Sequence, residues 1–428
     1  MTLPREPGRG PAAGRERPLL LVIATGPQAY REYLFSSLRT RYRIHLLHVA
    51  PASWERPYIT GSDVVPDFSA DTLVTAARRV TAREPAAGVL CWDEARIHAT
   101  ARVARLLGLP GGDPDAVERC RDKYLSRSAL AAAGVRQPSF ALVGTVGEAL
   151  AAAERIGYPV ILKPRAAAAS YGVVLVHDRQ ELAARFGFSH DATVPEAPRH
   201  PSPVLVEEFI GGPEISVDSV IAGGMVTPVF VAHKDVGFPP FFEETQHLVH
   251  HPDALLGDPA LRASLQSAHA ALGVRDGWTH SEFKLTAEGP ALVEVNARLG
   301  GDLVPYLGLR ASGTDPGLLA AAAACGEPVR VTSDREMVAG VRFLYAQRDD
   351  VLVESAQFDA GDLPAATDRA VVLAEPGSRV RHPPAGLVSG RVAFVTAVAS
   401  SDQACRAALD AAERALRLRV AGLSAAAT

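Results

Sequence analysis

The sequence feature that most constrains the fold is a pair of short alternating segments late in the chain, separated by a turn. Residues 279–286 and 290–296 have the period-two alternation of β-strands, and the short loop between them predicts a hairpin. In that hairpin Glu282 lies opposite Glu294, and the alternation brings Asn296 to the same face. Opposed carboxylates repel unless a cation lies between them, and Glu and Asn oxygens are ligands that Mg²⁺ prefers. The segment therefore predicts a metal-phosphate site, with a solvated polar face as the alternative.

Composition predicts a soluble, multidomain globular protein. A chain of 428 residues with 47% hydrophobic and 21% charged residues can bury two or three cores. The formal net charge of −4, without a cluster of Lys and Arg among aromatic residues, gives no basic surface for nucleic acid or an anionic membrane. No apolar run approaches the length that spans a bilayer. The four scattered cysteines have no C-x-x-C spacing, which is typical of reduced thiols and indicates the cytoplasm.

A tail and an α/β domain are predicted at the start of the chain. Residues 1–17 are rich in Pro, Gly and Arg, which predicts a disordered tail. The arginines before apolar residues 19–24 mimic a signal peptide, but the short run is better interpreted as a buried strand. Residues 18–120 alternate strands with helices, which predicts a Rossmann-like domain with a parallel sheet. The predicted strands are 19–25, 44–49 and 88–92, and the predicted helices are 29–39, 70–83, 98–107 and 117–133.

Two further domains are predicted to be α+β. Short β-rich runs begin at Val135 and define a two-lobed domain at residues 121–326, with an exposed Pro-rich loop at 193–203. A third domain at residues 327–428 combines strands with a final amphipathic helix. The predicted strands are 139–143, 160–164, 173–176, 204–209, 214–221, 226–233, 338–344, 351–358, 370–373 and 392–399, and the final helix is 401–418.

Three further segments precede the hairpin in an order that resembles the ATP-grasp ligases. Lys123 opens a predicted helix that ends in an AAGV turn, and residues 157–164 read GYPVILKP. The resemblance implies an ATP-grasp fold in which Lys123 and Lys163 bind the phosphates of ATP, with Lys163 also serving catalysis. A lysine on so apolar a strand is costly to bury unless an anion meets it, which independently favours this role for Lys163.

The loop of residues 166–172, AAAASYG, stands where the family has a Ser/Gly-rich loop over the triphosphate. Small residues suit close contact between backbone N–H groups and phosphate, but only Gly reaches left-handed conformations freely. The alanines therefore leave Ser170 and the amides near Tyr171 and Gly172 as the expected contacts. A plain Ala-rich turn is the alternative interpretation.

Residues 204–217, VLVEEFIGGPEISV, resemble the family's hinge for adenine and ribose. The resemblance implies that the backbone around Glu208 and Ile210 pairs with the adenine edge. It also implies that Glu214 accepts hydrogen bonds from the ribose, with Glu207 as a further contact. An edge strand with solvent-facing acids is the alternative.

The resemblance also gives roles to the hairpin. It implies that Glu282 and Glu294 bind Mg²⁺ and that Asn296 is a second ligand of one ion. Arg298 would lie by the transferred phosphoryl group as a catalytic residue. Two Mg²⁺ ions, or Mn²⁺ in their place, together with an arginine would neutralise the γ-phosphate oxygens, as phosphoryl transfer requires. The expected cofactors are therefore ATP and Mg²⁺.

Two more segments resemble the L-amino acid ligases, which join unprotected amino acids. They are CWDE at residues 91–94 and FEETQH at residues 242–247. The resemblance implies that Glu94, Glu244 and His247 line the amino acid pocket beside Arg298, where a carboxylate would hold the substrate's ammonium group. The alternatives are an ordinary strand-end acid at Glu94 and a metal-binding H-x-x-H-H cluster that begins at His247.

Asp302 departs from the pattern of these ligases, which can carry a bulky aromatic residue there. An acid at this position predicts a preference for a larger or cationic substrate group.

The predicted function is an ATP-dependent carboxylate–amine ligase. It would activate an amino acid as an acyl phosphate, couple it to an amine and release ADP and phosphate. The C-terminal domain resembles the one that closes these ligases and could cover the site or form a homodimer. One alternative is a bicarbonate- or formate-activating ligase, as in biotin carboxylase and the purine pathway. The other is an ATP-binding protein without chemistry, which the Ala-rich loop suggests.

Overall fold

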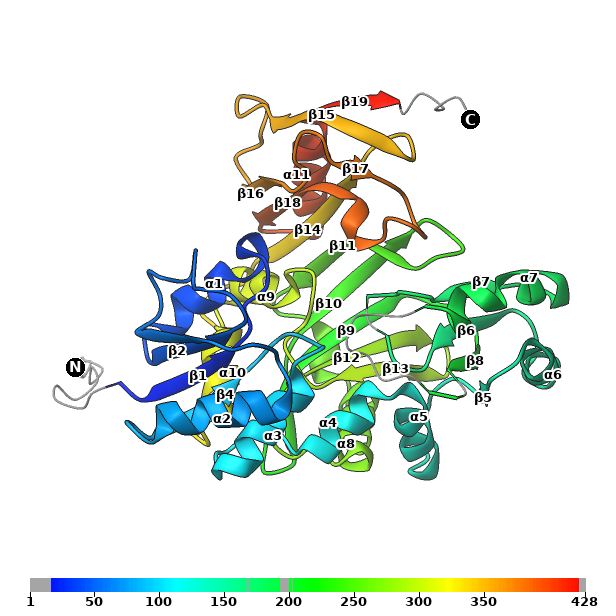
Figure 1. Ribbon diagram of the computed structural model, residues 1–428. Coiled ribbons are helices and arrows are strands. Elements are labelled where there is room, and N and C mark those ends of the chain that lie inside the picture. The colour runs from blue at the N-terminus through cyan, green and yellow to red at the C-terminus, as the bar shows by residue number, and fades with distance from the viewer. Residues whose placement is uncertain (1–16, 168, 193–199, 202, 423–428) are drawn as a thin grey trace, which may run out of the picture.

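The computed structural model describes residues 17–167, 169–192, 200–201 and 203–422, and Figure 1 shows three parts arranged around a central sheet. The N-terminal part lies at the left, a small sheet with its two helices at the right and the C-terminal part at the top. The predicted tail lies outside the described residues apart from Arg17, and so does most of the predicted loop at 193–203. None of the described helices is long and apolar enough to cross a membrane.

A parallel sheet forms the N-terminal part, as the alternation of strands and helices predicts. Its elements are β1 (Leu19–Ile23), α1 (Gln28–Leu38), β2 (Arg43–His48), β3 (Gly61–Val64), α2 (Ala70–Thr81), β4 (Ala86–Leu90) and α3 (Ile97–Leu107). The strand order is β3-β2-β1-β4, and every pairing is parallel. Successive residues of β1 enter two different cores, which explains why the whole strand is apolar. Strand β3 was not predicted, because its sequence GSDV has no apolar run.

The predicted single helix at residues 117–133 is wrong, because the chain forms two helices there. They are α4 (Pro114–Arg121) and α5 (Lys123–Ala132). Asp122 separates them and caps the second, since its side chain accepts hydrogen bonds from the backbone N–H groups of Tyr124 and Leu125. The apolar pattern continues through this break, but the helix that the family resemblance began at Lys123 is confirmed. The break places Lys123 at the buried first position of α5.

The small lobe is an antiparallel sheet with two helices. Its elements are β5 (Phe140–Val143), α6 (Val146–Ile156), β6 (Val160–Pro164), β7 (Val174–Val176), α7 (Arg179–His190) and β8 (Val204–Glu208), in the strand order β5-β8-β6-β7. Val160 and Leu162 share one apolar core with α6 and α7. Strand alternation therefore turns Lys163 and Glu207 toward the opposite face.

An antiparallel sheet of eight strands crosses the centre, in the order β13-β12-β9-β10-β11-β14-β18-β16. The strands are β9 (Glu214–Ala222), β10 (Met225–Gly237), β11 (Glu243–His250), β12 (Gly277–Thr286), β13 (Gly289–Asn296), β14 (Val338–Tyr345), β16 (Thr367–Val372) and β18 (Arg391–Ala399). Hydrogen bonds join β11 to β14 across the predicted boundary after residue 326. The sheet is thus continuous there, and the three domain limits stay a prediction.

The remaining elements complete the C-terminal part and flank the large sheet. They are η1 (Ala254–Gly257), α8 (Pro259–Leu272), α9 (Val304–Ser312), α10 (Pro316–Ala324), β15 (Val351–Phe358), β17 (Arg379–Val380), η2 (Val388–Gly390), α11 (Asp402–Arg414) and β19 (Leu416–Gly422). The predicted final helix at 401–418 is too long, because the chain leaves it after Arg414 and pairs with β15 as β19. The alternating sequence LRLRV suits that strand better than a helix.

One face of the large sheet carries most of its polar residues. The hairpin register pairs Glu282 with Glu294, which confirms the predicted opposition. Residues directly opposite each other on neighbouring strands point to the same face. The register therefore places on this polar face Glu214, Lys234, His247, His280, Lys284 and Asn296.

Two β-bulges adjust the side chains of this polar face. In β11, Glu244 and Gln246 pair with consecutive residues of β10, so Thr245 is the extra residue. The bulge brings Glu244 and His247 to the same face, although three positions in a regular strand would separate them. Val293 is the extra residue of β13 in the same way.

Helix α9 fixes the segment that follows the hairpin by packing against β10. A Cβ atom at Gly308 would lie 2.4 Å from a ring carbon of Phe230. The Phe230 side chain is fully buried and has no room to move aside.

We therefore expect Gly308→Ala to lower the free energy of unfolding by about 1–3 kcal/mol through overpacking. Gly147→Ala, in helix α6, is the matched control, because no atom lies within 4 Å of its added Cβ. The control should be neutral or slightly stabilising, since Ala favours helix over Gly. Thermal unfolding of the two variants measures the difference, and equal melting temperatures would contradict the packing described.

Candidate active site

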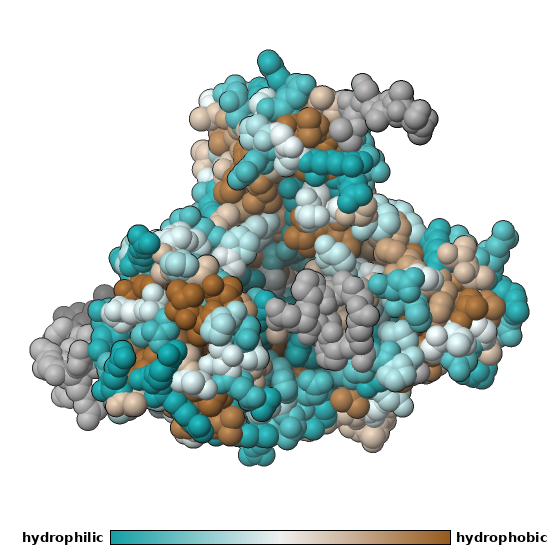
Figure 2. All heavy atoms as spheres, in the orientation of Figure 1, coloured by the Kyte–Doolittle hydropathy of each residue, from teal (hydrophilic) through white to brown (hydrophobic). Residues whose placement is uncertain are grey.

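Two adjoining cavities lie on the polar face of the large sheet. The first, of about 170 Å³, lies between the small and large sheets, and we call it the two-sheet cavity. The second, of about 330 Å³, lies between the N-terminal part, the hairpin end and the C-terminal part, and we call it the charged cavity. Figure 2 shows the surface hollowed where these parts meet. The cavities adjoin at the five residues that line both: Ala169, Ser170, Glu244, Glu282 and Arg298.

The structure brings the residues singled out in the sequence to these two cavities. His247 lies behind the lining, with its Nε2 atom 3.1 Å from Oε2 of Glu244. The other candidates divide between the cavities. Lys123, Lys163, Glu207, Glu208, Ile210, Glu214, Glu294 and Asn296 line the two-sheet cavity, Glu94 and Asp302 line the charged cavity, and Ser170, Glu244, Glu282 and Arg298 line both.

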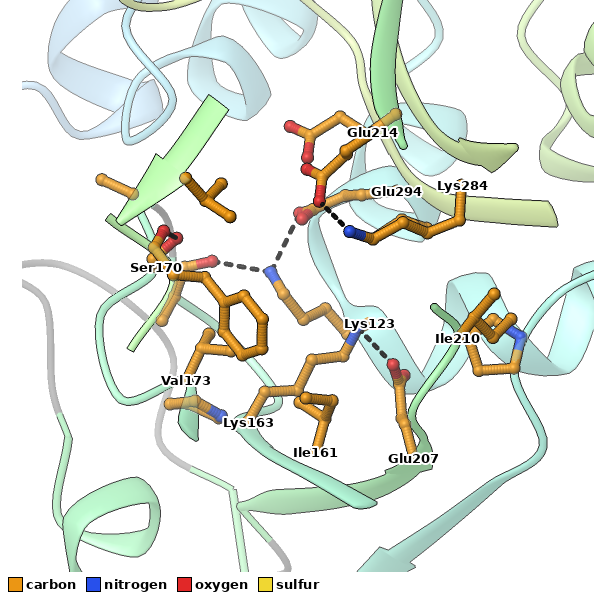
Figure 3. Close-up of a pocket in the computed structure, with 18 of the residues that line it drawn as sticks. Lys123, Ile161, Lys163, Ser170, Val173, Glu207, Ile210, Glu214, Lys284 and Glu294 are labelled. Atoms are coloured by element: carbon orange, nitrogen blue, oxygen red, sulfur yellow. Dashed lines mark hydrogen bonds and ion pairs between the residues drawn. The ribbon is translucent and has the colours of Figure 1, made fainter. Parts of the chain in front are cut away.

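Lys163 meets a protein anion on the wall of the two-sheet cavity (Figure 3). Its Nζ atom lies 2.7 Å from Oε2 of Glu207. The carboxylate of Glu207 also accepts two hydrogen bonds from Arg127, at 2.7 Å to Oε1 and at 3.1 Å to Oε2. Burial lowers the pKa of Lys163 to about 8 despite the attraction of Glu207. Burial also opposes ionisation of Glu207, but Arg127 and Lys163 outweigh it and hold that pKa at about 2. One carboxylate shared by two cations leaves Lys163 incompletely neutralised, which suits an anion contact.

Lys123 faces the same cavity from the start of α5. Its Nζ atom lies 2.9 Å from Oε1 of Glu294 and donates to the carbonyl oxygen of Ala167 at 2.7 Å. Figure 3 shows this ammonium group between the loop and the hairpin. The carboxylate of Asp122 is held in turn by Arg165, at 2.8 Å. Lys123 therefore links a predicted metal ligand to the loop of residues 166–172.

Two residues in the described part of that loop adopt a strained backbone although neither is glycine. Ala169 and Ser170 have φ angles of 54° and 56°, in the left-handed region that costs about 1–2 kcal/mol for a residue with a Cβ. The Ser170 hydroxyl donates to the carbonyl oxygen of Phe242 at 2.9 Å. Gly172 is required, because a Cβ there would lie 2.5 Å from Pro164. Residue 168, within the predicted loop, lies outside the described residues.

The predicted adenine and ribose hinge lies at the far end of the two-sheet cavity. Glu208 ends β8 and Glu214 begins β9, with Ile210 between them. The side chain of Glu208 is exposed and accepts a hydrogen bond from the backbone N–H of Ser139 at 3.1 Å. Glu214 contacts Lys234 and Lys284, each at 2.9 Å. Figure 3 shows Glu214 and Lys284 on one side of the cavity and Ile210 on another.

The two hairpin glutamates offer charged oxygen atoms to a cation. Oε2 of Glu282 lies 3.0 Å from Nζ of Lys234. Burial disfavours the charged form of Glu282, but Lys234 and His280 outweigh it and hold its pKa well below the usual range. Asn296 adds an amide oxygen to the same cavity. Ionised carboxylates and an amide oxygen are a donor set that fits Mg²⁺.

Glu94 and Arg298 form an ion pair where the charged cavity begins. Nε of Arg298 donates to Oε2 of Glu94 at 2.6 Å, and Arg121 lies 3.5 Å from the other carboxylate oxygen. Arg298 also donates to the carbonyl oxygen of Leu299 at 2.9 Å. Glu94 is therefore positioned to orient Arg298, and any substrate ammonium would share this carboxylate with the arginine.

Asp302 carries a charge that the protein itself neutralises. Arg391 donates to both of its carboxylate oxygens, at 2.7 and 2.8 Å, and also contacts Glu243 at 3.0 Å. Nε2 of His247 lies 3.7 Å from Asp302. The carboxylate is therefore paired before any ligand binds, and the expectation that Asp302 selects a cationic substrate stays a prediction.

The H-x-x-H-H pattern does not form one cluster. His247 points to the polar face, where Glu244 and Asp302 lie close enough to share a metal ion with it. His250 points to the opposite face because it lies an odd number of positions from His247 in the strand. There its ring stacks on His233 at 4.9 Å, beside Asp253.

Sequence reasoning missed several charged residues of the site. Lys234 follows the apolar run VFVAH, which is the same signal that singled out Lys163, so it could have been found. Arg127 lies within a helix, and its ion pair with Glu207 gives no local signal. Arg31 and Arg391 come from the two ends of the chain and reach the charged cavity only through the tertiary structure.

The chain is similar to known proteins in sequence and in fold. The family model described as "ATP-grasp domain" matches residues 156–305. The uncharacterized protein y4rH of Sinorhizobium fredii is 30% identical over 400 residues, which cover 91% of this chain and 80% of that protein. Alanine–anticapsin ligase of Bacillus subtilis is 32% identical over 238 residues, which cover 50% of this chain and 49% of the ligase. The match thus spans about half the length of that relative.

A solved structure has the same fold over nearly the whole chain. The L-amino acid ligase from Bacillus licheniformis superimposes with a TM-score of 0.79 at 21% sequence identity, over 96% of this chain and 100% of the ligase. The chain belongs to the ATP-grasp ligases. Within them it is similar in sequence to alanine–anticapsin ligase and in fold to the L-amino acid ligase.

Glu207 pairs with both Lys163 and Arg127, and this shared interaction leads to a stability prediction. Glu207→Gln would leave two buried cations without a counter-charge, which costs about 3–5 kcal/mol of unfolding free energy. Glu208→Gln is the matched control on the same strand, because its side chain is exposed and should cost less than about 0.5 kcal/mol. Denaturant unfolding at neutral pH compares them, and similar losses would refute the role of Glu207.

The same ion pair predicts a dependence on pH. The pKa of Glu207 is about 2 in the folded protein against 4.5 for an unperturbed glutamate. Its stabilising contribution is therefore present above pH 4.5 and is lost as the pH falls toward 2. The free energy of unfolding is measured at a series of pH values in this range. As the pH falls, the Glu207→Gln variant should lose less of it than the native protein does.

Proposed function

We propose that this protein binds MgATP in the two-sheet cavity and an amino acid in the charged cavity, and joins the amino acid to an amine. The observation that carries the proposal is the junction of the two cavities at Glu282 and Arg298. One side of the junction offers lysines and oxygen ligands suited to a metal-bound triphosphate. The other side offers paired carboxylates and guanidinium groups suited to an amino acid.

The nucleotide would be held by groups from both sheets. Lys123 and Lys163 bind phosphate oxygens, while the backbone near Glu208 and Ile210 pairs with adenine. Glu214 accepts hydrogen bonds from the ribose hydroxyl groups. The strained backbone at residues 169 and 170 brings the Ser170 loop over the cavity, because its hydroxyl is tied to Phe242 on the opposite wall.

Glu282, Glu294 and Asn296 would hold the metal. We expect two Mg²⁺ ions, which Mn²⁺ can replace, and they neutralise phosphate oxygens in the transferred group when bound. Lys234 holds Glu282 ionised and in place. The hairpin register keeps Glu294 directly opposite.

The reaction would occur in two steps at the junction. An oxygen of the amino acid carboxylate attacks the γ-phosphorus, and the bond to the bridging oxygen breaks to release ADP. The amine nitrogen of the second substrate then attacks the acyl carbon, the bond to the phosphate oxygen breaks, and the nitrogen loses a proton to solvent. Arg298, oriented by Glu94, stabilises negative charge on the phosphoryl group and then on the acyl oxygen.

The substrate side would hold the donor amino acid through its ammonium group. Glu244 is the best candidate, since it lines both cavities and its charge is shared with Lys234 and His247. An ammonium contact there directs the α-carboxylate toward Arg298 and the phosphates. We place the enzyme in the cytoplasm, with a homodimer through the C-terminal part and small-molecule substrates as its partners.

A screen of amino acids with MgATP tests the function directly. Phosphate release is measured with each amino acid alone, with pairs of amino acids and with bicarbonate, and the mass of any product is then determined. We expect release that depends on amino acids and a product whose mass is the sum of the two substrates less one water. Release with bicarbonate alone would favour a carboxylating ligase, and ATP binding without any release would favour a non-catalytic protein.

Replacing one metal ligand tests the mechanism. Glu294→Gln keeps the size of the side chain but removes the charge, so we expect the turnover number to fall by more than about 100-fold. Glu288→Gln, at the exposed turn of the same hairpin, is the matched control and should keep native activity. Thermal unfolding shows whether both variants are folded. Near-native turnover of folded Glu294→Gln would refute the metal assignment.

A further inference from the structure

Among the described residues, every cation that lines the charged cavity is paired with a carboxylate, with one exception. Glu94 pairs with Arg298, Asp302 pairs with Arg391, and Glu243 also contacts Arg391. Glu244 and Glu282 both contact Lys234, at 2.6 and 3.0 Å. Buried charges are costly unless such pairs form, so the exception is informative.

Arg31 is that exception. It lies in the first turns of α1 and lines the charged cavity. Its Nη1 atom donates a long hydrogen bond of 3.4 Å to the carbonyl oxygen of Gly300. No carboxylate of the described residues lies within 4.0 Å of its guanidinium group, whereas each of the other two arginines of this cavity has one.

The surroundings of Arg31 destabilise its positive charge, which a bound anion would stabilise. Burial lowers its pKa and the nearby positive charge of Arg298 lowers it further, and together they outweigh Tyr33 and Asp302, which act in the opposite direction. The side chain is only partly exposed to solvent. A guanidinium group has five N–H donors, and one long bond to a carbonyl leaves most of them for another acceptor.

A purely structural role explains Arg31 less well. The bond to Gly300 would tie α1 to the turn after the hairpin. One 3.4 Å contact to a neutral oxygen is weak compensation for a cation beside a second cation, and an apolar or neutral residue would pack there at lower cost. The surroundings of Arg31 instead suit a guanidinium group that binds a ligand anion.

We propose that Arg31 binds a carboxylate group of the substrate, so that the enzyme selects a substrate with a free carboxylate besides the one that is activated. The proposal rests on the proposed function, because it assumes an amino acid in the charged cavity. Arginine recognises a carboxylate through two parallel hydrogen bonds, a geometry that lysine does not reproduce. The site therefore favours an anionic group, the opposite of the preference first expected from Asp302.

Two sources could supply this carboxylate. One is the α-carboxylate of the acceptor amino acid, whose amine attacks the acyl phosphate beside Arg298. The other is a side-chain carboxylate of the donor amino acid. The two differ in which substrate must carry the acid, and this difference is measurable.

The test compares acids with their neutral amides in native protein, Arg31→Gln and Arg31→Lys. Acceptors are offered as the amino acid and as its α-amide, and donors as Asp or Glu and as Asn or Gln. For whichever of the two substrates Arg31 contacts, native protein should prefer the acid to its neutral amide. Arg31→Gln should raise the KM of that acid by about 10- to 100-fold and leave that of the amide unchanged. Arg31→Lys should recover only part of the affinity.

Arg39→Gln is the matched control, because this arginine follows the same helix but lies exposed outside both cavities. It should behave as native protein. If the preference for the acid over the amide is found for the acceptor, Arg31 contacts the acceptor's α-carboxylate. If it is found for the donor, Arg31 contacts the donor's side-chain carboxylate. If native protein uses acids and amides equally well, or if Arg31→Gln changes both equally, the proposal is overturned.

Failure of the proposed function can be told apart from failure of this proposal. The function fails if no amino acid causes phosphate release from native protein. Arg31 is then tested without turnover, by calorimetric titration of L-alanyl-L-alanine and L-alanyl-L-alaninamide in the presence of MgADP. Tighter binding of the acid by native protein, lost in Arg31→Gln, supports the proposal. Equal binding of the two peptides, or binding of neither, overturns it.

Discussion

Charge compensation at Lys234 is the interaction on which the site depends. Its buried ammonium group lies within 3.0 Å of three carboxylates, those of Glu214, Glu244 and Glu282. Without this cation, three like charges on one sheet face would repel one another and would favour protonation. Against the effect of burial, Lys234 lowers the pKa of Glu244 and Glu282, the groups proposed to contact substrate and metal, and it joins the two cavities electrostatically.

The same principle recurs across the active site with different partners. Arg127 and Lys163 share Glu207, Arg391 holds Asp302 and Glu243, and Glu94 holds Arg298. These ion pairs position the charged side chains before any ligand binds, which would reduce the reorganisation required during the proposed phosphoryl and acyl transfer. Arg31 stands apart from the pattern, and its unpaired charge is what points to a substrate anion.

Much of the site could be predicted from local patterns. Period-two alternation fixed the pairing of Glu282 with Glu294, and an apolar strand before Lys163 indicated a buried cation. Apolar periodicity runs through the break at Asp122 and predicted one helix, whereas the family resemblance correctly began a helix at Lys123. Strand β11 was missed because its sequence EETQHLVH is polar, and its bulge at Thr245 follows from pairing with β10 and leaves no local signal.

The sequence by itself determined the metal-site hairpin, the buried strand of Lys163 and the order of the ATP-grasp motifs, because strand alternation and charge on apolar strands are local properties. Only the tertiary structure decided which charges neutralise one another. Arg391 reaches Asp302 from a strand 89 residues later, and Arg31 reaches Gly300 across 269 residues. Such pairings depend on the packing of whole sheets, and the proposed preference for an anionic substrate group rests on them. The hairpin carboxylates were readable in the sequence, whereas the specificity of the cavity beside them was not.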